Sequence, residues 1–255
     1  MHDKELEKLK QEITNRKVLF ILRLCDPWEH GSTHYWYRFV YEMLDHPRVH
    51  VMLNYQPAEI TALFASRARR SQFVFAPYVY QAALELPIAH DQRKHRILFS
   101  GARDTRIYPL RNNMARTSTW WIPLRLMRET LDHPGYPDLK GTPVTHEIVG
   151  ADYVDWLARF RFAAVCSSRC RLEFLKYREF AYAGVVPVGD MPATLLDCPG
   201  DAWVPWRRNF VALTRSLRAM ADTGERAEKF RKFMREHRNA KAMRGMLTRQ
   251  LERLA

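Results

Sequence analysis

The sequence lacks the features that mark several large classes of protein. No run of roughly 18 apolar residues, the length that a membrane-spanning helix needs, occurs among the 255 residues. The chain starts with the charged segment HDKELEKLKQEITNRK and not with an apolar signal core. Internal repeats and low-complexity tracts are also absent. With 47% hydrophobic and 12% aromatic residues, the sequence predicts a soluble, cytoplasmic, globular protein with a packed core.

Cysteine is scarce, and its spacing fits no zinc site. The chain contains 4 cysteines. Cys166 and Cys170 lie four positions apart, and no second pair or histidine cluster is present to complete a tetrahedral site. Free and mostly buried thiols are the usual state of cysteine in a cytosolic protein. We therefore expect four free thiols and no metal centre.

Positive charge is in excess, with a formal net charge of +13 and a sequence pI near 9.8. Such a charge attracts polyanions, namely nucleic acid, anionic lipid headgroups or a phosphorylated substrate. Much of the excess lies between Arg207 and Arg253, where Arg and Lys recur with helical spacing. A solvated helical face is the simpler explanation, and contact with an anionic membrane or an acidic polymer is the alternative. No recognised nucleic-acid-binding motif accompanies the charge.

Short apolar runs alternate with amphipathic, helix-like segments along the chain. Strands are expected within residues 17–22, 48–53, 73–79, 96–100, 162–166 and 185–188, and helices within 3–15, 35–44, 59–69, from 109 onward, 151–159, 172–183 and after 206. Residues 122–131 fit a helix or a strand equally well. This alternation predicts an α/β fold with mainly parallel, Rossmann-like sheets.

The same pattern divides the chain into parts. Pro87 and the polar residues from His90 to His95 make residues 81–95 the best linker candidate. The predicted parts are an abbreviated N-terminal Rossmann-like unit at 1–80, a second Rossmann-like unit at 96–205, and C-terminal helices at 206–255.

Ligands of parallel α/β sheets bind beyond the carboxyl ends of the strands, so the loops there are the candidate sites. In the first of these loops, around His30, a glycine and hydroxyls precede a helix, although an ordinary helix cap explains them too. In the second, Gly101 follows a strand, and Arg103 and Arg111 are close enough in sequence to bind a diphosphate together. Single arginines on loops are also commonly just solvated.

Two further loops carry polar residues after a strand. Ser167 and Ser168 lie between a strand and a helix, where they can bind a ligand or only cap the helix. The segment LEFLKYREFAYAGVVPVGDMP then presents Lys176 and Glu179 on a helix that ends at Gly184. The two charged residues form either part of an anion and polyol site or a surface ion pair, and Gly184 is either a close-approach residue or only a helix terminator.

Taken in order, strand-Gly-Arg, YPLR, HPGY, strand-SS and KYREFAYAGVVPVGDMP resemble the catalytic, donor-binding half of GT-B glycosyltransferases, nearest the CgeB-like and exostosin-like group. The resemblance spans residues 75–192. It implies a fold of the GT-B type and a nucleotide-sugar donor. It also implies transfer of the sugar to a glycan, a lipid-linked acceptor or a protein.

The resemblance further implies roles for individual residues. Glu179 would accept the ribose hydroxyls, and Lys176, Arg103 and Arg111 would lie near the diphosphate. The same cleft would be lined by Gly101, Tyr108, Ser167, Ser168 and Gly184. The sequence contains no DxD pair of the kind that bridges a metal ion to a diphosphate, so no metal is expected. The first unit would supply the acceptor base, for which His30 and His34 are the candidates.

Two departures from the family keep other functions open. The N-terminal unit, residues 1–80, is shorter than the complete Rossmann domain that the resemblance implies, and Arg178 stands where an aromatic residue is common. A non-catalytic binding or scaffold subunit is therefore the first alternative, and a basic nucleic-acid-associated protein is the second. A shortened first domain is also compatible with homo-oligomerisation, and the protein can be peripheral at a membrane.

Overall fold

The computed structural model describes residues 2–24, 35–53, 73–76, 78–103, 108–134, 144–167, 171–207 and 209–254. The chain forms two compact units, which we call unit 1 (Met1–Tyr78 with Lys241–Ala255) and unit 2 (Val79–Ala240). The predicted linker at 81–95 lies within unit 2. The predicted C-terminal helices are divided, because the last one belongs to unit 1.

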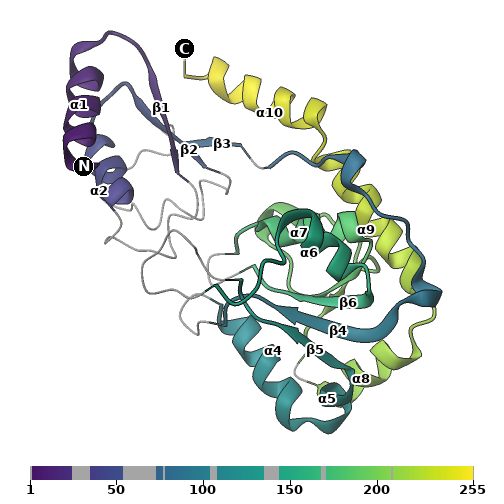
Figure 1. Cartoon of the computed structure of the whole chain (residues 1–255). Helices are drawn as coiled ribbons and strands as arrows, with labels where there is room; N and C mark the ends of the chain where they lie inside the picture. The colour runs from purple at the N-terminus through teal and green to yellow at the C-terminus, as the bar shows by residue number, and fades with distance from the viewer. Residues whose placement is uncertain are drawn as a thin grey trace. The chain divides into compact units, whose positions relative to one another are not determined.

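Unit 1 is built on a parallel sheet in the order β1-β2-β3 (Figure 1). Its described elements are α1 (His2–Asn15), β1 (Phe20–Leu24), α2 (Tyr35–Met43), β2 (Val49–Leu53), β3 (Phe73–Phe75) and α10 (Ala240–Glu252), whose first residue is assigned to unit 2. The amide of Gln250 on α10 exchanges two hydrogen bonds with the backbone of Phe75, at 2.8 and 2.7 Å. The C-terminal helix is thereby fixed to the strand β3. The helix predicted at 59–69 lies outside the described residues.

Unit 2 contains a five-stranded parallel sheet in the order β5-β4-β6-β7-β8. The strands are β4 (Lys94–Ser100), β5 (Arg128–Leu131), β6 (Phe160–Val165), β7 (Val186–Gly189) and β8 (Val204–Pro205). The helices are α4 (Pro109–Trp120), α5 (Ile122–Met127), α6 (Gly150–Leu157), α7 (Leu175–Ala183), α8 (Phe210–Ala219) and α9 (Thr223–His237), with 3-10 turns η3 (Ala82–Leu84), η4 (His90–Gln92) and η5 (Ala193–Leu195).

Helices cover both faces of the unit 2 sheet, so the unit has three layers. Alternate strand residues belong to two separate cores: Leu98 and Ala163 pack with α6, α7 and α9, whereas Ile97 and Phe162 pack with α4, α5 and α8. Figure 1 shows the two groups of helices on opposite sides of the sheet. The prediction of an α/β fold with parallel sheets is confirmed. None of the described helices combines the length and the apolar character that crossing a bilayer requires.

A few element predictions differ from the structure. Residues 122–131 form a short helix followed directly by a strand, α5 and β5, so both readings of this segment hold in part. The helix predicted from Leu172 begins only at Leu175, because Phe174 has an extended backbone. The two-residue strand β8 is not predicted, since a strand that short has no detectable periodicity.

Candidate functional site

Lys176 lies at the carboxyl edge of the unit 2 sheet. The strands β4 and β6 are parallel neighbours, so Ser100, which ends β4, lies at the same edge as the loop that leads from β6 to α7. Lys176 is the second residue of α7. Its Nζ donates to Ser100 Oγ and to Tyr153 OH, both at 2.9 Å, and lies 4.6 Å from the centroid of the Tyr153 ring. The ammonium group is therefore held where ligands of parallel sheets bind.

Gly101 lies between two cations. Its φ of +84° is in the left-handed region that favours glycine. A Cβ added to it would lie 3.3 Å from Lys176 Cε and 3.4 Å from Arg111 Nη1. The absence of a side chain thus leaves room for Lys176 and Arg111 to approach the backbone at Gly101.

Arg111 is buried in the first turn of α4, with 4% of its surface exposed. Its Nη1 donates to the carbonyl of Ala102 at 3.0 Å, and its guanidinium lies 4.1 Å from the centroid of the Tyr108 ring. Within the described part of the chain, its Nε has no hydrogen-bond partner. The Tyr108 ring also contacts the edge of Phe174, at 5.7 Å between centroids. Tyr108 therefore positions Arg111 by packing.

The electrostatics around these cations are strongly positive. Burial lowers the pKa of Lys176 to about 8, and the charge of Arg111 acts in the same direction. Burial also lowers the pKa of His133, and both Lys176 and Arg111 contribute to that lowering. Arg111 thus acts on both groups as a positive charge, and Glu179 offsets this in part at Lys176. A ligand with two or more negative charges would relieve this repulsion.

The N-termini of two helices add to the positive potential. The helices α4 and α7 begin just beyond the carboxyl ends of β4 and β6, with Arg111 and Lys176 in their first turns. A helix N-terminus carries a partial positive charge, which disfavours cations there and favours anions. Arg111 and Lys176 therefore lie where the helix termini favour an anion.

Glu179 is the acidic member of this region. It is half-buried one turn after Lys176 on α7, and its carboxylate accepts no hydrogen bond from a described residue. Burial raises its pKa, while the charges of Lys176 and Arg178 oppose the increase. Glu179 also contributes to the raised pKa of Tyr153. We call Lys176 and Arg111 the cation cluster. The carboxylate of Glu179 is thus close to this cluster and keeps its capacity to accept hydrogen bonds.

Other predicted site residues have partners within the protein. Arg103 Nη2 lies 2.7 Å from Asp132 Oδ1, and both side chains are exposed. Ser167 is fully buried, and its backbone N and Oγ donate to the carboxylate of Asp190 at 2.8 and 2.6 Å. Ser167 and Asp190 therefore hold the loop after β6 against the end of β7.

The structure does not bring Gly184 to this cluster. Gly184 ends α7 with φ +62°, and it follows Lys176 by eight residues, which is about 12 Å along a helix. Its carbonyl accepts from His90 Nε2 at 2.7 Å and from Arg93 Nη1 at 2.8 Å. A Cβ at this position would lie 2.5 Å from Ile88. The position requires glycine for helix termination and close packing.

Some predicted residues lie outside the described part of the chain, namely His30, His34 and Ser168. Among the residues that the structure does describe, no group of three or more His, Cys, Asp or Glu side chains could hold a metal ion. Cys166 and Cys198 are free and buried.

Three residues next to the cation cluster are missing from the sequence-based prediction. Ser100 and Tyr153 bind Lys176, and His133 shares its electrostatic environment. Tyr153 reaches the site from α6, a helix without a motif. His133 is part of the HPGY segment, whose turn-forming residues conceal any other role. Only Ser100, the last residue of a predicted strand, could have been found from its position.

Comparison with known proteins identifies the fold. No protein-family model and no curated protein sequence matches the chain. The crystal structure of Anabaena Alr3699/HepE in complex with UDP matches with a TM-score of 0.58 and 11% identity, over 96% of this chain and 74% of that chain. The same protein in complex with UDP and glucose gives 0.56 and 11%, over 92% and 71%.

A third solved structure supports the same fold. An alpha-glucosyltransferase in complex with UDP and a 13-mer DNA containing an HMU base matches with a TM-score of 0.51 and 11% identity, over 98% of this chain and 82% of that chain. These likenesses show an α/β fold of the GT-B glycosyltransferase type, as the sequence predicts. Placement in the CgeB-like and exostosin-like group stays a prediction.

Proposed function

We propose that the protein is a glycosyltransferase that takes a sugar from a nucleotide-sugar donor and transfers it to a glycan, a lipid-linked acceptor or a protein. One observation carries the proposal: Lys176 and Arg111 flank Gly101 at the carboxyl edge of a GT-B-type sheet. The UDP bound to structures of this fold makes UDP-sugars the first donors to test.

The proposed donor contacts follow from the charges of the cluster. Lys176 and Arg111 bind the diphosphate, and the backbone at Gly101 approaches it closely. Arg111 Nε supplies a further donor, because no described residue accepts a hydrogen bond from it. Glu179 accepts the ribose hydroxyls.

Arg103, which is exposed and paired with Asp132, contributes long-range attraction and no fixed contact. Ser167 supports the loop after β6, and Ser168, which lies outside the described residues, is proposed as a further donor-binding residue.

The proposed chemistry is stabilisation of the departing nucleoside diphosphate. Breaking the glycosidic bond to the phosphate oxygen leaves the electron pair, and thus negative charge, on the diphosphate. Fixed cations and helix N-termini stabilise that charge without rearranging as it develops. Because these groups can do the work of a bridging ion, the proposal involves no metal. A base that accepts the proton of the acceptor would come from unit 1, where His30 and His34 are the candidates.

A thermal-shift panel with UDP, GDP, CMP and their sugars tests the proposal. A ligand that binds the native state raises the unfolding midpoint, so we expect a shift with one nucleotide class. Arg111→Met should make that shift much smaller at the same nucleotide concentration. Arg96→Met is the matched control, because Arg96 lies on the same strand as Ser100 and is exposed in a surface pair with Glu129.

Three outcomes contradict the proposal. A midpoint that no nucleotide changes removes the donor site. Equal nucleotide shifts in wild type and Arg111→Met place the binding elsewhere. A donor that binds but never releases its nucleoside diphosphate with glycan, lipid-linked or protein acceptors refutes glycosyl transfer and favours the non-catalytic binding subunit.

A further inference from the structure

Large apolar side chains are exposed on one outer face of unit 2. The exposed fractions are 62% for Trp120, 59% for Ile122, 63% for Leu126 and 50% for Val211. Trp120 contacts Phe210 at the start of α8, at 5.9 Å between ring centroids. Ile122 and Leu126 lie one turn apart on α5. The four side chains thus belong to the face formed by the end of α4, α5 and α8.

The same face carries arginines that no acidic residue neutralises. Arg116, Arg125, Arg215 and Arg218 are exposed on α4, α5 and α8. None of these three helices contains an aspartate or a glutamate. In the described ranges of the chain, none of the four arginines forms an ion pair. We call these four arginines, together with Trp120, Ile122, Leu126 and Val211, the α5–α8 face.

The neighbouring helix α9 provides the contrast. Its exposed basic residues have acidic partners: Lys229 pairs with Asp201, Lys232 with Glu236, and Arg235 with Glu85. A solvated face of this kind compensates its own charge and needs no ligand. The exposed face of α9 therefore fits the explanation of a solvated helical face. The α5–α8 face differs from it, because it combines positive charge without acidic partners with exposed apolar surface.

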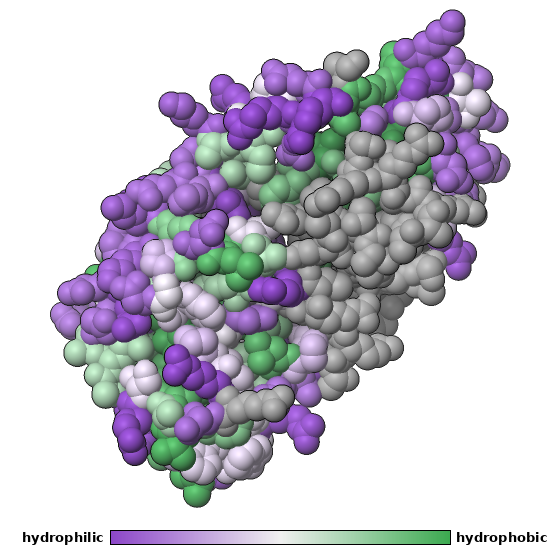
Figure 2. Space-filling model, turned by 180° about the vertical axis from the view of Figure 1, so that it is seen from behind, coloured by the Kyte–Doolittle hydropathy of each residue, from purple (hydrophilic) through white to green (hydrophobic). Residues whose placement is uncertain are grey.

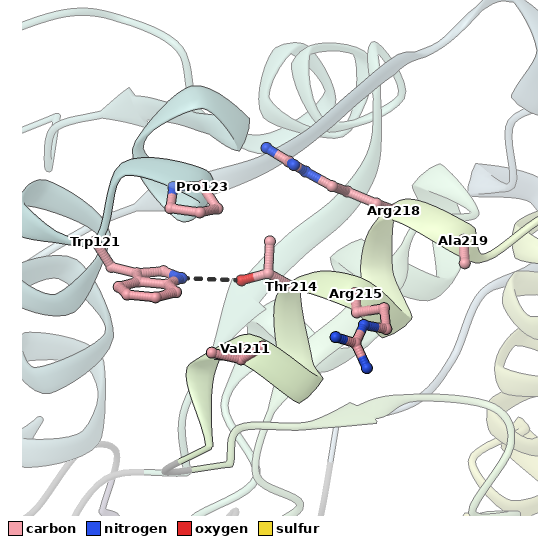
Figure 3. Close-up of a pocket in the computed structure, with 7 residues that line it drawn as sticks. All are labelled: Trp121, Pro123, Val211, Thr214, Arg215, Arg218 and Ala219. Atoms are coloured by element: carbon pink, nitrogen blue, oxygen red, sulfur yellow. Dashed lines mark hydrogen bonds between the residues drawn. The ribbon is translucent and has the colours of Figure 1, made fainter.

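A groove runs between α5 and α8 on this face. Its volume is about 460 Å³, and Trp121, Pro123, Val211, Thr214, Arg215 and Arg218 are among the residues that line it. Trp121 Nε1 donates to Thr214 Oγ1 at 3.2 Å and so joins the two walls. Figure 3 shows Arg218 and Arg215 extending to opposite sides of the groove. The groove is an apolar depression with a guanidinium on each side.

We propose that the α5–α8 face docks on the surface of an anionic phospholipid bilayer. Arginines attract the negative headgroups, and exposed tryptophan and aliphatic side chains gain free energy by entering the boundary between headgroups and acyl chains. The helices α4, α5 and α8 lie together at the lower end of unit 2 (Figure 1), and Figure 2 shows hydrophobic and strongly hydrophilic residues side by side at that end of the face seen from behind.

Nucleic acid is a poorer match for this face. Bases stack on aromatic rings, but Ile122, Leu126 and Val211 offer no ring for stacking, and their burial against a hydrated phosphate backbone gains little. The four arginines alone would suit either polyanion. The exposed aliphatic side chains therefore favour lipid over nucleic acid.

Co-sedimentation with vesicles tests the proposal on the full chain without any nucleotide. We expect binding to vesicles of equimolar phosphatidylcholine and phosphatidylglycerol, and none to phosphatidylcholine alone. The variant R215E/R218E should bind at least about tenfold more weakly. The matched control is K241E/R244E on α10, which changes the net charge equally at the same residue spacing and uses two exposed residues. It should retain binding within about twofold.

A second variant tests the apolar contribution. Replacement of Trp120 and Leu126 by serine leaves the charge unchanged, so weak binding at low salt should persist while the binding that resists high salt is lost. Wild-type protein that stays in the supernatant with anionic vesicles overturns the proposal. Equal weakening by the α8 and α10 double variants does the same, as does a preference for DNA over the vesicles.

This proposal does not depend on the glycosyltransferase assignment. The R215E/R218E variant should keep the nucleotide-induced thermal shift of wild type, because neither arginine contacts the cation cluster at Lys176. A variant that loses vesicle binding and keeps its nucleotide shift separates the two sites.

Discussion

Positively charged side chains have a favourable environment at the C-terminal end of helix α7 and a less favourable one at its N-terminal end. At the C-terminal end, Arg231 donates to the carbonyls of Ala181 and Tyr182 at 2.9 and 3.0 Å, and Arg93 donates to the carbonyl of Gly184 at 2.8 Å. Cations at a helix C-terminus are stabilised by the helix dipole. Every one of these contacts is internal to the protein, so this end serves the fold.

At the N-terminal end, the cations are not compensated in this way. Lys176 binds two neutral hydroxyls, Arg111 binds one carbonyl, and the helix dipole opposes both charges. The carboxylate of Glu179 offsets this in part at Lys176. The arrangement is consistent with the proposed binding of an anion at the N-terminal end of α7.

The largest predicted effect is structural and lies at the C-terminal end. Arg231→Met removes three hydrogen bonds that a buried arginine donates, to the carbonyls of Ala181, Tyr182 and Leu86. We expect the free energy of unfolding to fall by about 3 kcal/mol. Urea denaturation measures the loss. Affinity for UDP should be unchanged at temperatures where the variant is folded, and a variant of wild-type stability would refute the structural role.

The next effect lies at the N-terminal end and concerns binding. Arg111→Met removes a charge-assisted contact to the diphosphate, so we expect affinity for UDP to fall by about 2 kcal/mol, roughly thirtyfold. Calorimetry measures the affinity. The free energy of unfolding should change by less than about 1 kcal/mol, with Arg96→Met as control. Large destabilisation with intact affinity would make Arg111 a structural residue like Arg231.

Lys176→Met should separate stability from binding. The pKa of Lys176 is lowered to about 8. At pH 7 the charged form of this lysine is therefore less favourable in the folded protein than in the unfolded chain, which lowers the free energy of unfolding. Lys176→Met removes this cost, but also two hydrogen bonds and the attraction between Lys176 and Glu179, so we expect the free energy of unfolding at pH 7 to change by less than about 1 kcal/mol. Affinity for UDP should fall about tenfold. A large loss of stability with intact affinity would contradict this account.

The same pKa predicts how UDP affinity depends on pH. Below pH 8 Lys176 is protonated and can bind the diphosphate, whereas above pH 8 the free protein loses this proton. Affinity should therefore fall above pH 8, by at most about tenfold per pH unit, with proton uptake on binding. The phosphate groups of UDP are already ionised in this range. Lys176→Arg should remove the dependence, and a flat wild-type profile would contradict it.

The smallest predicted effect concerns Glu179 and the ribose. Glu179→Gln should weaken UDP binding by about 1 kcal/mol, roughly fivefold, because a charged acceptor becomes neutral. Deoxy-UDP, which lacks one ribose hydroxyl, provides the control. Wild type should prefer UDP over deoxy-UDP, and the variant should lose that preference. If both proteins discriminate equally, another residue recognises the ribose.

The fold was predictable from the sequence because buried parallel strands are continuous apolar runs. The segments that became β4, β6 and β7 are of this kind, and the helices between them are amphipathic. The proximity of Lys176 to Gly101 was predictable too, because the residues that follow parallel strands meet at one edge of the sheet. Neither inference needs knowledge of side-chain packing.

The details of the site could not be predicted, because they depend on contacts between distant segments. Tyr153 binds Lys176 from a different helix, and Asp190 binds Ser167 across 23 positions of sequence. In the sequence, Gly184 could be either a close-approach residue or only a helix terminator. Its neighbours Ile88 and Arg231 show that its role is structural. Spacing in the sequence carries none of this information.

Calorimetric titration of UDP into wild type and into the double variant R111M/K176M tests the central claim most directly. The account predicts saturable binding to wild type and a loss of at least about a hundredfold in the double variant, whose unfolding midpoint stays close to that of wild type. Absence of binding to wild type, or equal binding to both proteins, would contradict it.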